Sequence, residues 1–433
     1  MGIQLSDAQA SFSEGSLAEN GVQSEMAAAP EQVTGRILYV TTDGAGTLCS
    51  IEQPCDLQTA ADESEDGDEI RVAAGVYNDF AVTGSTTQTL RLVTSVLIEG
   101  GYTSTNWTAD PDPVANETIL DGNDQVRVVL ILGPISPTIR GFSIRSGQAV
   151  QGAGIYQPDA NGNAVIKNNR IFNNTASGPG SQGGGGVYIG GGSVIVGNEI
   201  FDNSTTGSGG GIFISNNLGG NAATVEDNEI YGNFTTAPSV VGGGIFVGGT
   251  GTDAVISRNE IYQNSSNFGG GIGVFVNSGA LIENNMIHNN TAVGTDAGGG
   301  GLALGGVSTL WHNTIAVNSA GTNGGGIYVF DSTTEIINSI IANNTGGTNS
   351  GIHVAFGSAA GSFNNVFNNG SNATLTDPIA GDPMFVNPGG NDFHLTTGSP
   401  DINTGDDSFD VNIDFDGQGR PFDGGIEVGA DEY

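Results

Sequence analysis

The chain has 433 residues and a formal charge of −36, with 73 glycines and two cysteines. This charge repels phosphate backbones and anionic headgroups, and no apolar run approaches the ~18 residues of a membrane span, which excludes a nucleic-acid partner and membrane insertion. The glycines follow no G-X-Y period, so collagen is excluded. Hydrophobic residues make up 37% of the chain and predict that it folds.

Residues 1–35 are small, polar and acidic, and they lack the basic stretch and apolar core of a signal peptide. We expect a disordered leader or linker here. Cys49 and Cys55 follow, six residues apart, in a segment with turn-forming residues. Either a disulfide closes this loop in an oxidising compartment or both thiols stay reduced. We favour the disulfide, because no histidine lies nearby to complete a metal site.

The next residues predict one short helix and a strand. Asp56 is a suitable N-cap for a helix that ends at Glu63. Residues 69–72 then alternate between apolar and polar side chains, which is typical of a strand.

From about residue 150 the sequence repeats the motif Asn-x-Ile-x-x-Asn at intervals of 25–31 residues. The first asparagines of the motif are Asn169, Asn198, Asn228, Asn259, Asn285, Asn313, Asn338 and Asn364. A Gly-Gly-Gly-Ile type element recurs between them. Short β-branched clusters and glycine turns at this period predict a solenoid of strands, because a helical repeat would tolerate neither. We expect the asparagines to adopt left-handed turns and to hydrogen-bond to their counterparts one coil away.

These units resemble the right-handed parallel β-helix family of the pectin-lyase-like superfamily over roughly residues 36–375. The resemblance implies an all-β fold, a right-handed parallel β-helix with a short N-terminal helical cap and a C-terminal β cap. The tail carries Asp-Pro-Met-Phe from Asp382, Gly-Ser-Pro from Gly398 and Gly-Ala-Asp-Glu-Tyr from Gly429. It is similar to the choice-of-anchor Q domain of bacterial surface proteins. We therefore expect a leader over 1–35, the β-helix over 36–375 and this cap over 376–433.

Alternation along each repeat strand places the isoleucine inside and its two neighbours outside. One outward column then contains Arg170, Glu199, Glu229, Glu260, Met286 and Thr314, and the other contains Phe172, Phe201, Tyr231, Tyr262, His288 and Ala316. Aromatic faces dock against sugar rings, and carboxylates bind hydroxyls or Ca²⁺. The expected ligand-binding residues are Arg170, Phe201, Tyr231, Tyr262 and His288.

The same columns also have a purely structural interpretation, because aromatic ladders stabilise stacked coils and exposed glutamates can simply be solvated. A second aromatic column, from Tyr156 through Tyr188, Phe213 and Phe246, has no acidic companion and favours that interpretation.

An enzyme of this fold would use the same outer face. The candidate catalytic residues are Glu199, Glu229, Glu260, Asp227 and Arg258. The last two form the one juxtaposition comparable to the calcium and arginine site of pectate lyases. The sequence lacks the Gly-His-Gly and Arg-x-Lys motifs of polygalacturonases. With nine arginines and one lysine, a site for uronate polymers would be short of positive charge unless calcium neutralises both partners.

The segment from Asn412 to Gly417 matches the start of a calcium loop, with Asn412, Asp414 and Asp416 as ligands and Asp423 at the twelfth position. Pro421 and the absence of flanking helical patterns argue against an EF-hand. A looser Ca²⁺ loop and a simple Asx-rich turn both remain open.

The sequence thus predicts a secreted or cell-surface solenoid that binds or scaffolds, with a polysaccharide or cell-surface glycan as its expected partner and Ca²⁺ as its expected cofactor. The alternative is a calcium-assisted polysaccharide lyase or glycoside hydrolase acting on the same face.

Overall fold

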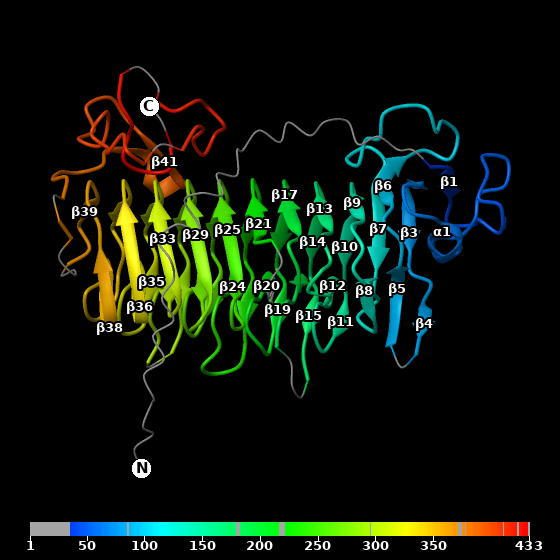
Figure 1. Cartoon of the computed structure of the whole chain (residues 1–433), viewed down its shortest axis with the longest axis horizontal. Helices are drawn as coiled ribbons and strands as arrows, with labels where there is room; N and C mark the ends of the chain where they lie inside the picture. Colours follow the sequence, from blue (N-terminus) through cyan, green and yellow to red (C-terminus); the bar gives the residue numbers. More distant parts are fainter. Residues whose placement is uncertain are drawn as a thin grey trace, which may run out of the picture. The chain divides into compact units, whose positions relative to one another are not determined.

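Short parallel strands form nearly all of the regular structure (Figure 1). The computed structural model describes residues 35–431 except 85, 179–181, 216–220, 295, 371–374, 377, 410 and 422–423. The expected leader, apart from Gly35, lies outside the described residues, and so does Asp423. Among the described residues, no helix is both long enough and apolar enough to cross a membrane.

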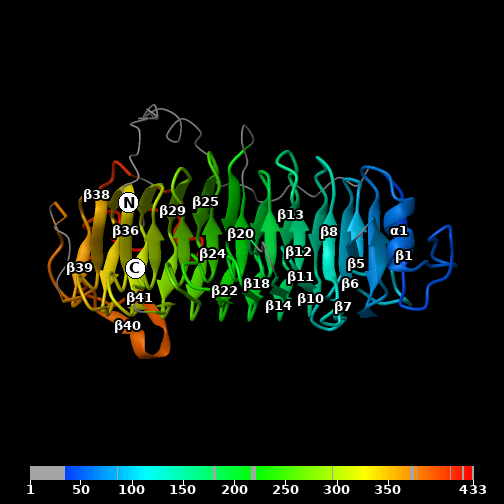
Figure 2. The same ribbon diagram turned by 90° about the horizontal axis from the view of Figure 1, so that it is seen from below.

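Successive coils contribute strands at equivalent positions, and these strands pair in parallel to form columns along the solenoid (Figures 1 and 2). The first column contains β5 (Thr86–Leu92), β8 (Arg127–Ile131), β12 (Ile155–Gln157), β16 (Val187–Ile189), β20 (Ile212–Ile214), β24 (Ile245–Val247), β28 (Ile272–Val274) and β32 (Leu302–Leu304). The second contains β1 (Ile37–Val40), β2 (Glu69–Ala73), β6 (Leu97–Tyr102), β9 (Thr138–Arg140), β13 (Val165–Lys167), β17 (Val194–Val196), β21 (Ala223–Glu226), β25 (Asp253–Ser257), β29 (Gly279–Glu283) and β33 (Val307–Trp311). The longer β36 (Ile327–Ile337) and β38 (Ile352–Ala360) extend through both columns.

The third column is an 11-stranded parallel sheet. It contains β3 (Gly75–Tyr77), β7 (Thr118–Asp121), β10 (Ser143–Arg145), β14 (Arg170–Phe172), β18 (Glu199–Phe201), β22 (Glu229–Tyr231), β26 (Glu260–Tyr262), β30 (Met286–His288), β34 (Thr314–Ala316), β37 (Ile340–Ala342) and β39 (Asn365–Phe367). The fourth contains β11 (Gln148–Ala149), β15 (Thr175–Ala176), β19 (Ser204–Thr205), β23 (Phe234–Thr235), β27 (Ser265–Ser266), β31 (Thr291–Ala292) and β35 (Ser319–Ala320). The chain is therefore an all-β solenoid of about eleven coils, as the repeat predicts.

Inward-facing aliphatic side chains fill the solenoid. The third column buries Ile144, Ile171, Ile200, Ile230, Ile261, Ile287, Ile315 and Ile341 completely. Their equal spacing follows from the parallel register, in which Ile200 pairs with Ile171 and with Ile230. The prediction that the isoleucine of each repeat points inward is confirmed.

Two ladders of buried asparagines follow the turns before and after the third column. Asn198 donates from its backbone N–H and its Nδ2 to Oδ1 of Asn228, at 2.9 and 3.0 Å. Its Nδ2 also donates to the carbonyl of Ile166 one coil back, at 2.8 Å. The expected bonding between coils is confirmed. The expectation that the ladder asparagines themselves adopt left-handed turns is wrong by one position. The residue before each ladder position has the positive φ, for example 55° at Asp227 and 51° at Arg258.

The repeat predicted at Asn338 and Asn343 shifts by one residue, whereas Asn364 and Asn369 of the last repeat are in the ladders as predicted. Ser339 rather than Asn338 continues the first ladder, accepting from the Asn313 N–H and donating its own N–H to Asn364. Asn344 rather than Asn343 continues the second ladder. Asn338 occupies the left-handed turn position, with φ of 51°, and its side chain contacts the C-terminal segment instead.

The N-terminal end is covered by α1 (Leu57–Glu63), which buries Leu57, Ala60 and Ala61. Asp56 caps this helix by accepting from the Thr59 N–H at 2.9 Å, as predicted. Cys49 and Cys55 form a disulfide beside it. A short β4 (Ala81–Thr83) pairs antiparallel with β5.

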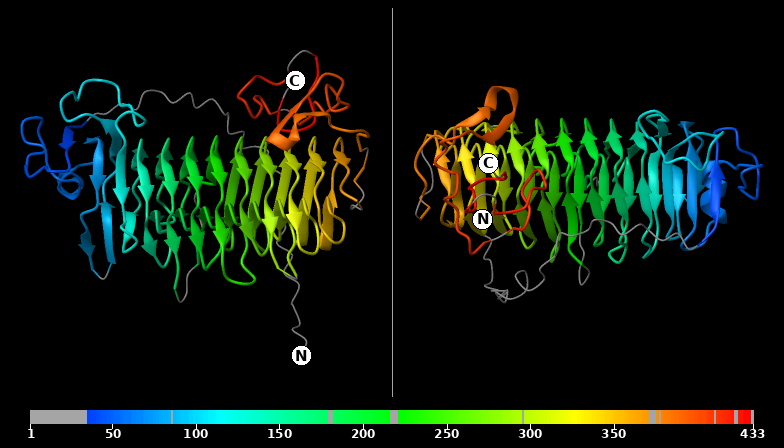
Figure 3. Two further views of the ribbon diagram at one scale, coloured as in Figure 1. Left: turned by 180° about the vertical axis from the view of Figure 1, so that it is seen from behind. Right: turned by 90° about the horizontal axis from the view of Figure 1, so that it is seen from above.

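The C-terminal residues form a lobe over one side of the last coils (Figure 3). It contains the antiparallel strands β40 (Phe385–Asn387) and β41 (Asp392–Leu395), joined by the 3₁₀ turn η1 (Pro388–Gly390). This lobe forms hydrogen bonds with side chains of the solenoid. The Asn284 Nδ2 donates to the Ile413 carbonyl at 2.8 Å, and the Ala430 N–H donates to the Thr314 hydroxyl at 3.1 Å.

Candidate functional site

The candidate site is the outer surface of β14, β18, β22 and β26, which we call the open face. The register places Arg170, Glu199, Glu229 and Glu260 in one outward row and Phe172, Phe201, Tyr231 and Tyr262 in the next, as the alternation predicts. The loop between β6 and β7 rises near one end of this face and the C-terminal lobe rises near the other (Figures 1 and 3).

The aromatic row is a continuous stack. Neighbouring ring centroids are 4.8 Å apart for Phe172 and Phe201, 5.0 Å for Phe201 and Tyr231, and 4.9 Å for Tyr231 and Tyr262. The ring planes differ by only 5–11°. Each ring therefore turns its faces toward its neighbours, which stabilises the coils. A ligand on this surface would meet ring edges and hydroxyls rather than the open ring faces that the sequence suggested.

Each glutamate of the open face is held by the ring of the following coil. The Tyr231 hydroxyl donates to Oε1 of Glu199 at 2.6 Å, and the Tyr262 hydroxyl donates to Oε1 of Glu229 at 2.5 Å. Burial, followed by these hydrogen bonds, raises the pKa of both tyrosines. The two predicted columns are thus linked by carboxylate–phenol pairs in two successive coils.

Arg170 lies at one end of the glutamate row. Its Nε donates to Oε2 of Glu199 at 2.6 Å, and its Nη1 is 3.9 Å from Oε1 of Glu117, which precedes β7. Half of the Arg170 side chain remains exposed, so it supplies the positive end of an otherwise acidic row.

His288 does not belong to the open face, although its position in the column is the predicted one. Its imidazole is only 1% exposed, because Phe393 of the C-terminal lobe packs against it with centroids 4.8 Å apart. Its Nε2 is 3.0 Å from Oε1 of Glu260. The aromatic stack continues through His288 and ends beneath the lobe, so a ligand cannot reach this predicted binding residue.

Arg258 and Asp227 meet at the turn between the second and third columns. Arg258 Nε donates to Oδ1 of Asp227 at 2.7 Å, and its Nη2 is 3.1 Å from Oε2 of Glu226. Burial works to lower the pKa of Arg258, but the hydrogen bond and charge of Asp227 outweigh it and raise that pKa. Burial raises the pKa of nearby Glu283 to about 7. The predicted juxtaposition is present, and Arg258 is a buried, charged residue.

The predicted calcium loop is a tight turn. Asp414 is buried, its Oδ1 accepts from the Gln418 N–H at 2.7 Å, and its own N–H donates to the Gln418 carbonyl at 2.9 Å. Asn412 is exposed and its carbonyl accepts from the Arg420 N–H. The Asx-turn interpretation accounts for Asp414, whereas calcium binding by Asn412, Asp414 and Asp416 stays a prediction.

Sequence reasoning missed the role of His312. This imidazole is completely buried, with Nε2 2.8 Å from the Phe409 carbonyl and Nδ1 in contact with the Arg420 guanidinium. Burial and then the charge of Arg420 lower the pKa of His312 to about 3. A histidine next to Trp311 in a repeat carried no signal of a contact with residues about a hundred positions later.

Two comparisons with known proteins bear on the fold. A family model described as the right handed beta helix region matches residues 210–377. The solved structure of the pectate lyase Pel9A is similar, with a TM-score of 0.58 and 13% identity over 93% of this chain and 98% of that one. The chain is a right-handed parallel β-helix.

A second solved structure is less similar. The structure of XylC with xylose aligns with a TM-score of 0.43 and 10% identity over 91% of this chain and 98% of that one. A search of curated proteins finds no match. At these identities the likeness of the β-helix to Pel9A concerns the fold alone. The resemblance of the tail to the choice-of-anchor Q domain stays a prediction.

Proposed function

We propose that this β-helix is a secreted or cell-surface protein that binds neutral polysaccharide along the open face. The observation that carries the proposal is the repetition of one polar unit, a glutamate held by a tyrosine, at intervals of a single coil. A polymer of similar units would meet the same contact in two successive coils, so weak single contacts would add along the chain.

The hydrogen-bonding capacity of the face supports this proposal. Oε1 of Glu229 accepts from Tyr262, while its Oε2 has no hydrogen-bond partner among the described residues. Glu229 is exposed, and Glu260 and Tyr231 are half-buried. Such carboxylates accept hydrogen bonds from sugar hydroxyls, and charged acceptors make the stronger bonds. The tyrosines orient the carboxylates and so reduce the entropy lost on binding.

The charge of the face favours a neutral ligand. Glu199, Glu229 and Glu260 line it, and Arg170 is the one cation among these outward positions. A polyuronate would be repelled by this row and by the net charge of −36. Calcium bridging between both sets of carboxylates is the condition under which an acidic polymer would bind.

The lyase alternative is less well supported. A catalytic arginine would have to act as a base, but the Arg258 guanidinium is ion-paired with Asp227 and Glu226 and its pKa is raised. A glycosidase would need two carboxylates on this face, and the register places Glu199, Glu229 and Glu260 on neighbouring paired strands.

Affinity electrophoresis of the full chain through gels containing single neutral or acidic polysaccharides tests the proposal, with and without calcium. We expect retardation by at least one neutral polymer. Glu229→Ala should weaken that binding about 10- to 100-fold, the value of one charge-assisted hydrogen bond. Glu335→Ala, an exposed glutamate of β36 outside the open face, is the matched control.

Two results would count against the proposal. Equal retardation of Glu229→Ala and Glu335→Ala would show that the open face is not the binding surface. New reducing ends, or absorbance from unsaturated sugars, in the same mixtures would favour the hydrolase or the lyase instead of a non-catalytic binding protein.

A further inference from the structure

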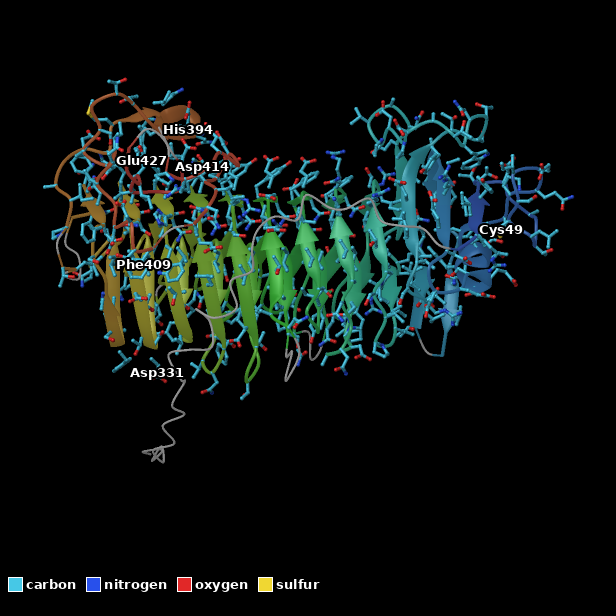
Figure 4. All side chains as sticks on the ribbon, turned by 45° about the horizontal axis from the view of Figure 1, so that its top comes forward. Cys49, Asp331, His394, Phe409, Asp414 and Glu427 are labelled. Atoms are coloured by element: carbon cyan, nitrogen blue, oxygen red, sulfur yellow. A yellow bond between two sulfur atoms is a disulfide. The ribbon has the colours of Figure 1, made fainter. Side chains whose placement is uncertain are left out.

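The geometry points to a binding site for a divalent transition-metal ion in the C-terminal lobe, formed by His394, Asp416 and Asp431. Each residue offers one ligand atom, and these atoms lie within 4.8 Å of one another. Figure 4 shows His394 in this lobe, above the last coils of the solenoid. The site is separate from the open face and independent of the proposed polysaccharide binding.

Three segments of the lobe converge to build the site. His394 lies on β41, which the pairing of Phe385 with Leu395 holds against β40. Asp416 lies in the turn that follows Asp414, and the Phe415 N–H donates to the Ala430 carbonyl at 2.8 Å, which brings that turn beside Asp431. Because Ala430 also bonds to Thr314 of β34, the site is built against the solenoid rather than on a free loop.

The distances between the ligand atoms fit an ion better than they fit direct bonds. His394 Nε2 is 3.3 Å from Oδ2 of Asp416 and 3.8 Å from Oδ2 of Asp431. Two ligands bound to one transition-metal ion at about 2.0–2.2 Å are themselves about 3–3.5 Å apart. The observed separations are close to that value and the longer one exceeds a hydrogen bond.

Asp431 supplies an independent sign of a missing partner. This residue is only 6% exposed, and its Oδ1 has no hydrogen-bond partner within the part of the chain that the structure describes. Buried carboxylate oxygens are nearly always satisfied, because burying an unpaired charged group is unfavourable. Oδ2 is the Asp431 oxygen that lies 3.8 Å from His394 Nε2, and an ion held by both oxygens of Asp431 would also satisfy Oδ1.

The surroundings of His394 indicate which kind of ion is bound. Its Nδ1 is 2.6 Å from Oδ1 of Asp392, so Nδ1–H donates to that carboxylate and leaves the Nε2 lone pair directed at the site. This is the usual second partner of a metal-binding histidine. Imidazole with carboxylates suits Zn²⁺ or Mn²⁺, whereas Ca²⁺ prefers oxygen ligands alone. The site therefore differs from the predicted calcium loop, with which it shares Asp416.

Isothermal titration of the untagged, chelator-treated full chain with ZnCl₂, MnCl₂ or CaCl₂ tests the inference. We expect one Zn²⁺ or Mn²⁺ per chain and at least 100-fold weaker binding in His394→Gln and in Asp431→Asn. Asp392→Asn keeps all three ligands and should weaken binding about 10- to 100-fold. His353→Gln, which removes a histidine of β38, is the control and should bind normally.

The opposing interpretation is a protonated His394 paired with the three aspartates and no ion. It predicts no stoichiometric binding of Zn²⁺ or Mn²⁺, and that result would overturn the inference. Binding that His394→Gln leaves unchanged would overturn it as well. A second readout needs no variant and so does not depend on whether the variants fold. Spin-echo spectroscopy of the wild-type chain loaded with Mn²⁺ must detect an imidazole nitrogen coupled to the ion. Its absence would also reject the site.

Discussion

Acid should release the C-terminal lobe from the solenoid, because His312 must stay neutral while the lobe is attached. Its Nε2–H donates to the Phe409 carbonyl at 2.8 Å, and its Nδ1 accepts from Arg420. A proton on Nδ1 would remove that contact and place two positive charges side by side in a buried site. Once the lobe detaches, His312 returns to an ordinary pKa.

The magnitude follows from the two pKa values of His312, 6.5 for an unperturbed imidazole and about 3 in the folded chain. Above pH 6.5 neither state binds a proton and the attachment has its full stability. As the pH falls below 6.5, only the detached state is protonated. Linkage then predicts a loss of about 2.6 kcal/mol between pH 7.5 and 4.5, a factor of about 80 in the attachment equilibrium.

Another buried group opposes this change. Burial raises the pKa of Asp401 to about 7, so protonation of Asp401 stabilises the folded chain as the pH falls. The wild-type curve contains both effects, together with that of buried Glu283, and does not isolate any of them. His312→Gln removes only the first, because the glutamine amide can donate to Phe409 and accept from Arg420 without titrating.

Hydrogen exchange of peptides from residues 385–395 and 412–421, compared between wild type and His312→Gln, measures the attachment at each pH. We expect the ratio of their protection factors to change about 80-fold from pH 7.5 to pH 4.5. Amides of β18 and β22 serve as an internal reference. A ratio that stays within twofold across this range would refute the role of His312.

Two further predictions concern stability. Burial of Asp401 should lower the unfolding free energy of the wild type by about 3 kcal/mol from pH 4.5 to pH 7.5, and Asp401→Asn should abolish this decrease. Denaturant titrations of both proteins at the two pH values measure it. An equal change of unfolding free energy with pH in the wild type and the variant would show that the carboxyl is not buried in solution. Asn264→Ala leaves the Asn233 N–H and the Ile230 carbonyl unpaired, which should cost about 1–3 kcal/mol per group. Exposed Asn161→Ala is its control and should change stability by less than about 0.5 kcal/mol.

The solenoid could be predicted because its stabilising contacts repeat with the sequence. Once Ile200, Ile230 and Ile261 are placed inside, the alternation of strands fixes the outward positions of Glu229 and Tyr231. The period does not decide which of two adjacent polar residues enters the ladder. Asn338 and Ser339 both satisfy the local pattern, and contacts with Asp406 and His312, distant in sequence, hold Asn338 at the turn position.

The site was harder to predict because its boundaries come from contacts distant in sequence. Nothing near His288 indicates that Phe393 covers it. Likewise, Tyr188 and Phe213 point away from the core as expected, but they are buried in a cluster with Val241 rather than exposed. An outward position in a repeat is therefore not the same as an accessible one, and the covering residues lie in loops and in the tail that do not repeat.

The end of the ring stack beneath Phe393 gives the C-terminal lobe a second consequence. Because it covers Met286 and His288, the lobe fixes where the accessible run of rings stops. The length of that run can change only in whole coils, since each added repeat between β14 and β30 would contribute one more ring and one more carboxylate at about 4.8 Å. Duplicating or deleting one repeat would then lengthen or shorten the surface by a fixed step, while both ends keep their structure.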